Sequence, residues 1–142
     1  MLSKSSKYAI RAVLYLSINS DENKKLSPTD IAEAIEIPAP FIAKILQELT
    51  KRGLISSLKG RGGGFYLNEK NKKNSLISIV DSIDGIEKFQ ECMLGLAVCS
   101  DLNPCPIHHT IAPLRKNIVE HLTYKTIDEL ATEVIKGTTH LI

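Results

Sequence analysis

Apolar residues recur every three or four positions through most of the first half of the chain, which predicts short amphipathic helices. The pattern indicates one helix over residues 3–19 and a second that begins after Ser27, where Pro28 and Asp30 suit the first turn. A third helix is expected from Pro40 onwards. Two short helices joined by about four residues, the second with a polar outer face, are typical of a helix-turn-helix unit.

Strand-like residues and glycines follow the third helix. Residues 54–58 and 65–67 are expected to form two short strands around the turn KGRGGG at residues 59–64. A β-hairpin directly after a helix-turn-helix unit is a wing, and its glycines let the backbone approach phosphates closely. A nucleotide-binding loop is the alternative, but the turn lacks the G-x4-G-K-[ST] form and does not precede a helix.

The second half of the chain is expected to be helical around one long loop. Residues 68–74 have the composition of a polar, basic loop, and residues 75–84 that of a short helix. A long helix should run from Pro106 to about residue 123, and Pro113 should kink it or mark its true start. Thr126 and Glu129 form a capping box for a last helix.

These elements predict a mainly α fold with a small β-hairpin. We expect three parts: a winged helix-turn-helix DNA-binding domain over residues 1–85, a cysteine-bearing loop over 86–106, and a dimerisation helix with a C-terminal helix over 107–142.

The long helix carries an apolar seam whose members are spaced by four, three, four and four residues. The seam consists of Ile107, Ile111, Leu114, Ile118 and Leu122. Such spacing is typical of a helix that packs against another helix. Because too little neighbouring chain is available to cover it, we expect a homodimer through this seam.

Charge is divided unevenly along the chain. Residues 1–73 carry 13 Lys and Arg against 7 Asp and Glu, whereas residues 74–142 carry 5 against 9. A basic half can be a merely solvated surface, but together with a wing it indicates double-stranded DNA as the partner. The predicted DNA contacts are Ser27, Thr29, Pro40, Lys44, Gln47, Lys51, Lys59 and Arg61. Lys51, Lys59 and Arg61 are expected at phosphates or in the minor groove.

All three cysteines lie in one segment, ECMLGLAVCSDLNPCPIHH from Glu91. Cys92, Cys99 and Cys105 precede His108 with the spacing C-x6-C-x5-C-x2-H. Three thiolates and an imidazole make a complete ligand set for zinc or an iron–sulfur cluster. Cysteines that simply fill a core are the alternative, but the polar, turn-like neighbours argue against it.

The wide spacing favours a cluster over zinc. Structural zinc sites usually place two ligands two to four residues apart, and only Cys105 and His108 do so here. A disulfide framework would need an even number of cysteines and a secreted chain. No apolar run approaches the ~20 residues of a membrane span, and no hydrophobic signal segment follows Met1, so a cytoplasmic protein with reduced thiols is expected.

The sequence resembles the Rrf-two family of winged helix-turn-helix transcriptional regulators, in its IscR-like and NsrR-like branches, over nearly the whole chain. The resemblance is carried by KYAIRA at residues 7–12, IAE at 31–33, LQELTKRGLI at 46–55, GRGGGF at 60–65 and the three cysteines. It implies a homodimer, DNA half-sites read by the third helix and the wing, and an iron–sulfur cluster that reports iron–sulfur status, oxidants or nitric oxide.

The two branches differ in the fourth cluster ligand. IscR-like members hold a 2Fe–2S cluster by three Cys and a following His; NsrR-like members hold a 4Fe–4S cluster by three Cys and an Asp from the partner subunit's first helix. The first helix here has no Asp or Glu, which favours His108 and 2Fe–2S. A 4Fe–4S cluster is the alternative, and His109 is the rival imidazole. The third helix departs from better-known members at Pro40, Ala43 and Lys44, so no operator sequence transfers.

We therefore expect a regulator rather than an enzyme: a DNA-binding repressor whose DNA binding is controlled by the cluster. One alternative is a zinc-stabilised regulator without sensing. The other is a small iron–sulfur redox protein, against which the wing argues, because an electron carrier has no need of a basic, glycine-rich hairpin.

Overall fold

The structure, a computed structural model, describes residues 2–142. It is mainly helical with one two-stranded antiparallel sheet, which confirms the predicted fold class. The elements in chain order are α1 (Lys4–Asn19), α2 (Pro28–Ile35), α3 (Ala39–Lys51), β1 (Ser56–Leu58), β2 (Gly64–Tyr66), α4 (Glu69–Lys72), α5 (Leu76–Asp84), the 3-10 helix η1 (Ile86–Phe89), α6 (His108–Tyr124) and α7 (Ile127–Ile135).

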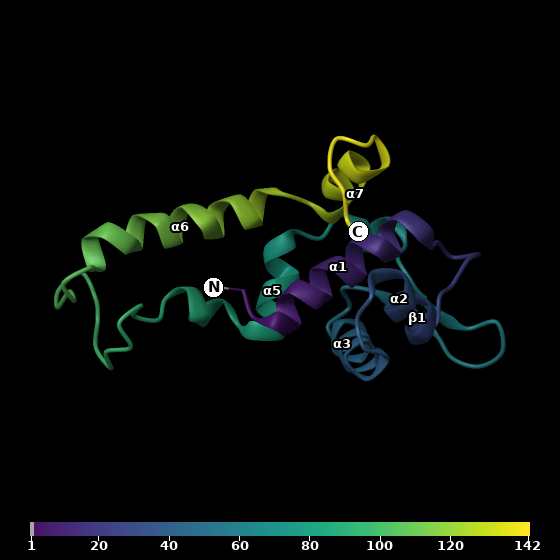
Figure 1. Cartoon of the computed structure of the whole chain (residues 1–142), viewed down its shortest axis with the longest axis horizontal. Coiled ribbons are helices and arrows are strands. Elements are labelled where there is room, and N and C mark those ends of the chain that lie inside the picture. The colour runs from purple at the N-terminus through teal and green to yellow at the C-terminus, as the bar shows by residue number, and fades with distance from the viewer. Residues whose placement is uncertain (1) are drawn as a thin grey trace.

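The molecule is elongated and has two parts (Figure 1). The head consists of α1 to α5, the β1–β2 hairpin and α7. The arm, residues 86–124, consists of η1, the cysteine loop (residues 90–107) and α6, and it extends from the head along the long axis. The hairpin and the cysteine loop therefore lie at opposite ends of the molecule.

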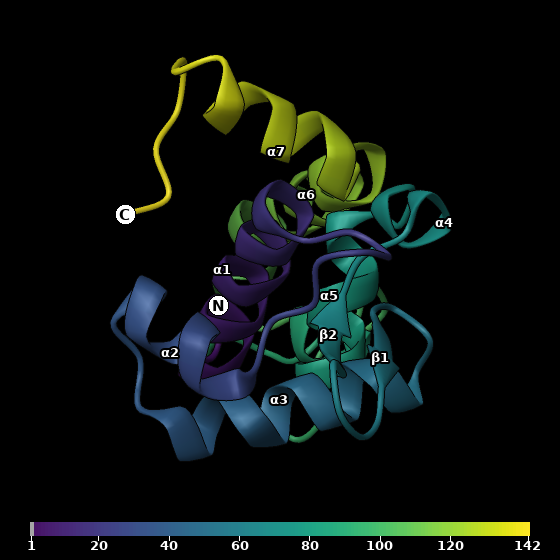
Figure 2. The ribbon, with the colours of Figure 1, turned by 90° about the vertical axis from the view of Figure 1, so that its right-hand side faces the viewer.

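Helix α1 is the centre of the head, with α2, α3, α5 and α7 around it (Figure 2). Ser3 caps it, because its hydroxyl accepts a hydrogen bond from the Ser6 backbone N–H at 3.0 Å. Ala9, Ala12 and Leu16 are fully buried. The small side chains of Ala9 and Ala12 let the neighbouring helices approach closely, so α1 can contact four helices at once.

The helix-turn-helix unit forms where it was predicted. The Ser27 hydroxyl accepts from the Asp30 N–H at 3.1 Å, and the Asp30 carboxylate accepts from the Ser27 N–H at 3.1 Å, so the capping box is complete. The Asp30 pKa is lowered by these hydrogen bonds. Glu36, with φ of 56°, ends α2 in the left-handed region, and α3 begins at Ala39.

The wing is a hairpin of two three-residue strands, in which Ser56 pairs with Tyr66 and Leu58 with Gly64. Leu26, in the chain that connects α1 to α2, extends it: its N–H donates to the Phe65 carbonyl at 2.9 Å and its carbonyl accepts from the Phe65 N–H at 2.8 Å. These two bonds fix the base of the wing to the helix-turn-helix unit.

Residues 68–74 do not form the loop that the sequence predicted. They contain the short helix α4, which Asn68 and Asn71 cap reciprocally, at 2.8 and 3.0 Å. Asn71 is buried and also contacts the wing, because its Oδ1 accepts from the Ser56 hydroxyl at 2.8 Å. An Asn–Asn box is a weaker sequence signal than Ser/Thr with Glu, so composition alone indicated a loop.

Helix α6 begins at His108 and continues through Pro113, so Pro113 is not its start. The chain then returns to the head. The Leu76 N–H donates to the Lys125 carbonyl at 2.9 Å, and the Ile127 N–H donates to the Asn74 carbonyl at 3.0 Å. Helix α7, capped as predicted by Thr126 with Glu129, packs on α1.

One apolar cluster holds the head together. Its fully buried members include Leu16, Ile31, Ile35, Ile42, Leu46, Leu49, Leu67, Ile79 and Ile127, from α1, α2, α3, α5, α7 and the chain after the wing. None of its buried residues comes from α6. Among the described residues, no helix combines the length and apolar character that crossing a membrane requires.

Candidate DNA-reading surface and cysteine site

A groove between α3 and the wing brings together four of the eight residues predicted to contact DNA. The four are Lys44, Gln47 and Lys51 on α3 and Lys59 on the wing. The groove has a volume of about 730 Å³, and all four side chains are exposed. Its carboxylate, Glu48, lies 3.4 Å from Arg52, so the three lysines leave a net positive surface. A basic groove beside an exposed helix suits the phosphates and base edges of duplex DNA.

The tip of the wing presents Arg61 between two glycines in left-handed conformations, Gly60 at φ 89° and Gly62 at φ 75°. A side chain at Gly63 would meet the Leu58 carbonyl oxygen at 2.1 Å, so the turn requires glycine there. Arg61 is exposed and lies outside the groove. The tip can therefore extend its guanidinium to a different part of a duplex.

The other three predicted contacts lie apart from the groove. Ser27 uses its hydroxyl oxygen to cap α2, although the O–H remains free to donate, and Thr29 is exposed in the first turn. Pro40 lines a second groove of about 760 Å³, which Lys44 also borders. The structure thus brings half of the predicted set together, leaves three residues elsewhere on the helical pair, and places Arg61 at the wing tip.

At the far end of the arm, the cysteine loop folds its three sulfur atoms together. The Sγ atoms of Cys92, Cys99 and Cys105 all lie within 4.8 Å of one another, although 13 residues separate the first from the last. Two thiolates on one tetrahedral metal ion lie about 3.8 Å apart, given metal–sulfur bonds of about 2.3 Å. The three sulfurs therefore surround one small volume that metal chemistry could use.

His108 lies beside this group and not within it. Its Nδ1 is 3.1 Å from Cys99 Sγ, and its Nε2 is 3.0 Å from an Asp101 carboxylate oxygen. The His108 side chain is 7% exposed, whereas His109, which meets it edge-on at 5.3 Å, is exposed. The hydrogen bond from His108 holds the pKa of Asp101 below its ordinary value.

The thiols are not equivalent. Backbone N–H groups of Leu96 and Leu94 lower the pKa of Cys92 to about 7. At Cys99, the backbone N–H of Cys105 favours the thiolate, but burial and the neighbouring thiols outweigh it and raise the pKa. Metal ligands must be thiolates, so Cys92 is the sulfur most ready to bind at neutral pH.

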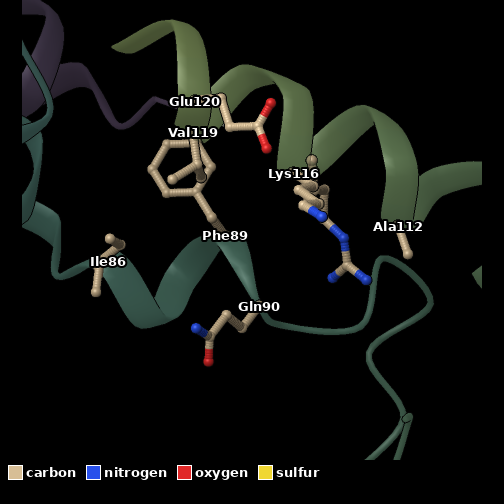
Figure 3. A pocket seen from close by; sticks show the side chains of 8 residues that line it. Ile86, Phe89, Gln90, Ala112, Lys116, Val119 and Glu120 are labelled. Atoms are coloured by element: carbon tan, nitrogen blue, oxygen red, sulfur yellow. The ribbon is translucent and has the colours of Figure 1, made fainter. Parts of the chain in front are cut away.

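Two contacts fix the cysteine loop to α6. The Arg115 guanidinium donates to the Glu91 carbonyl, next to Cys92. Phe89, buried at the end of η1, points up to α6 beside Val119 and lines a groove of about 430 Å³ between the two helices (Figure 3). Sequence reasoning missed both residues, because each acts across the arm and no local motif marks it.

The seam predicted for dimerisation is poorly covered by its own chain. His108 is the one fully buried residue of α6, Leu114 is 56% exposed, and the remaining four seam positions are half-buried. The cysteine loop adds further exposed apolar side chains: Met93, Leu94, Leu96, Val98 and Leu102. The arm therefore carries more of the large exposed apolar side chains than the head does.

Comparisons with known proteins match this chain to transcriptional regulators. The sequence profile of the Rrf2 family, described as "Iron-dependent Transcriptional regulator", matches residues 2–133. A candidate HTH-type transcriptional regulator of Aquifex aeolicus is 35% identical over 132 residues, covering 92% of this chain and 90% of the relative. The HTH-type transcriptional regulator IscR of Pectobacterium atrosepticum is 26% identical over 91% of this chain and 77% of its own. The solved structure of T. potens IscR superposes with a TM-score of 0.75 at 19% identity, covering 98% of this chain and 91% of that one.

Proposed function

The chain belongs to the Rrf2 family of transcriptional regulators, and we propose that it is a homodimeric DNA-binding repressor controlled by an iron–sulfur cluster. The observation that carries the proposal is the convergence of three cysteine sulfurs within 4.8 Å at the end of an arm opposite the wing. The family's description as iron-dependent supports iron as the metal.

The donor set fits an iron–sulfur cluster. Thiolates are soft ligands that select iron–sulfur clusters or zinc, and an imidazole suits both. Cys92, Cys99 and Cys105 would hold the cluster, and His108 would supply the fourth ligand. When bound, the cluster would supply a link that oxidants or iron shortage can break, which is what a sensor requires.

His108 is the favoured fourth ligand because it is buried next to Cys99, whereas His109 is exposed. Helix α1 contains no Asp or Glu, so it offers no carboxylate to a partner's site. In the IscR-like branch that the sequence resembles, three Cys and a following His hold a 2Fe–2S cluster, so we favour 2Fe–2S over 4Fe–4S.

The contacts within the arm support a route from cluster to DNA. His108 is the first residue of α6, and Arg115 ties that helix to the chain just before Cys92. Losing the cluster would free the loop between these two points and shift the start of α6. In a dimer built on the α6 seam, such a shift changes the relative placement of the two heads, and hence the fit of their α3 helices and wings to two half-sites.

The test is an anaerobic preparation assayed for iron and acid-labile sulfide, followed by DNA binding with the cluster present and removed. We expect a coloured protein with iron and sulfide in equal amounts and a change in DNA affinity of tenfold or more, about 1.4 kcal/mol or above, on cluster removal. A colourless protein that contains zinc would favour the zinc-stabilised regulator. A coloured protein with no DNA affinity in either form would favour the redox protein.

Adjacent histidines provide a matched pair for the fourth ligand. His108→Ala should make the cluster more easily lost, and His109→Ala should leave its absorption spectrum and lifetime unchanged. The reverse result would assign the ligand to His109.

A further inference from the structure

Two turns bring an acidic side chain onto the proposed cluster histidine. Ser100 and Asn103 exchange backbone hydrogen bonds, both at 3.2 Å, so residues 100–103 form a closed turn directly after Cys99. The backbone N–H of His108, the first residue of α6, donates to the Cys105 carbonyl at 3.0 Å. The first turn presents Asp101 and the second presents His108, whose Nε2 then lies 3.0 Å from the Asp101 carboxylate.

The chemistry of the two partners decides the proton position on the ring. A neutral imidazole has one nitrogen that donates and one that accepts, whereas an ionised carboxylate only accepts. The Asp101 carboxylate therefore accepts this hydrogen bond and the imidazole donates it. The hydrogen bond to Asp101 therefore requires the proton on Nε2, which leaves the lone pair on Nδ1, 3.1 Å from Cys99 Sγ.

We propose that Asp101 is a positioning residue that holds His108 as the Nε2–H tautomer, so that Nδ1 is the nitrogen presented to the metal beside Cys99. The metal-binding half of this inference rests on the proposed function. Two ligands of one tetrahedral metal, with bonds of about 2.3 Å to sulfur and 2.0 Å to nitrogen, lie about 3.5 Å apart. The observed 3.1 Å needs an opening of only a few tenths of an ångström. Histidine ligands generally donate their other N–H to a carboxylate or carbonyl, which fixes the ring.

Stability does not explain the Asp101 contact. The Asp101 side chain is 93% exposed, whereas its partner His108 is buried, so the carboxylate itself adds little packing to the fold. Replacing Asp101 should therefore leave the unfolding transition nearly unchanged while altering His108. If Asp101 were only a structural turn residue, replacing it would lower the stability of the fold and leave the His108 tautomer unchanged.

The first experiment uses reduced, metal-free protein with ¹⁵N-labelled histidine at pH about 8, where an ordinary imidazole is neutral. Two-bond couplings report which nitrogen carries the proton, and His108→Ala identifies the signal among the four histidines. We expect Nε2–H in the natural protein, a mixture in Asp101→Ala, and restoration in Asp101→Glu. Ser100→Ala is the control, because it removes the hydroxyl that accepts from the Asn103 N–H but keeps the carboxylate.

The second experiment measures cluster release to a chelator. Removing a carboxylate partner of a ligand histidine typically weakens metal affinity about 10- to 100-fold, so the Asp101→Ala cluster should be lost correspondingly more readily. The double variant with His108→Ala should lose it no faster than His108→Ala alone, because Asp101 acts through His108.

A proton on Nδ1 in the natural protein, an unchanged tautomer in Asp101→Ala, or an equal change in Ser100→Ala would overturn the inference. So would an additive effect in the double variant. If the protein takes up no cluster, the proposed function fails, but the tautomer measurement still decides the role of Asp101.

Discussion

Helices α3 and α6 both carry apolar residues at helical spacing, but the chain buries the apolar face of α3 and leaves most of that of α6 uncovered. The 13 residues of α3 bury Ile42, Ile45, Leu46 and Leu49, whereas the 17 residues of α6 bury only His108. The apolar side of α3 faces α1, α2 and α5 within the same chain, while α6 packs mainly on α5 near its end. An amphipathic helix is stabilised by whatever covers its apolar face, and the proposed dimer would supply that cover for α6.

The largest effect is expected when the apolar seam of α6 can no longer pack against a second copy of the chain. Ile111→Lys with Ile118→Lys removes two apolar side chains, each contributing about 1.5–3 kcal/mol when buried, from the proposed dimer seam. Sedimentation should show monomers, and the head should unfold as before. Asn117→Lys with His121→Lys adds the same charge to exposed positions of α6 and should leave the dimer intact. A full-strength dimer in the first variant would place the interface elsewhere.

The next largest effect tests whether the head, and not the arm, contains the core that stabilises the chain. Leu46 is fully buried, so Leu46→Ala should destabilise the protein by about 2–5 kcal/mol in denaturant unfolding. Leu102 in the cysteine loop is 98% exposed, and Leu102→Ala should stay within about 0.5 kcal/mol. Equal losses of stability would mean that the arm has a core of its own.

A smaller effect separates the wing tip from the groove. Arg61→Ala should weaken DNA binding about tenfold and flatten the salt slope by about 1 if the guanidinium contacts phosphate. A loss that depends on A·T content would instead indicate the minor groove. Lys136→Ala removes a charge next to the end of α7 and serves as the control. Equal affinity and an equal slope for both variants would remove Arg61 from the interface.

The smallest effect concerns the contact between Ser3, at the start of α1, and Asp84, at the end of α5. Burial raises the pKa of Asp84, but hydrogen bonds from the Ser3 hydroxyl and N–H outweigh it and hold the pKa below its ordinary value. The carboxylate therefore stabilises the fold above pH ~4 and loses this contribution as pH falls further. Asp84→Asn should reduce the stability at pH 7 by about 1 kcal/mol and flatten its decline in acid.

Ser3→Ala provides the partner measurement for Asp84. If the pair carries the effect, the double variant should lose less than the sum of the single losses. Additive losses would mean that Ser3 acts only as the α1 cap.

The parts of the fold that the sequence predicts correctly are those fixed by local chemistry. The boxes Ser27–Asp30 and Thr126–Glu129 involve neighbours in sequence, so their helix starts were readable. The turn glycines of the wing are equally local. The start of α6 at His108 was also readable, because the helix was expected from Pro106. Pro113 does not mark the start: it lacks the N–H that would donate four residues back, and α6 continues past it.

The candidate sites follow the same division. Cysteine spacing indicated that the sulfurs could meet, and the structure brings them together. Asp101 was missed because its contact depends on how a four-residue turn points a side chain back at a helix that begins five residues further on. Arg115 was missed because its acceptor is a backbone carbonyl 24 residues away, which no side-chain pattern records.

The return of the chain to the head after α6 has a consequence for how the protein folds during synthesis. Ile127 and Ala131 of α7 belong to the same buried cluster as α1, yet more than 100 residues separate them from it. A ribosome releases α7 after the arm, so the side of α1 that it covers stays open to water until the whole arm has been made. The entropy cost of closing a loop grows only with the logarithm of its length, so the long separation of α1 and α7 in the sequence lowers the stability of the folded protein little. It does create an interval in which a nascent head, nearly complete, exposes apolar surface that a chaperone could bind.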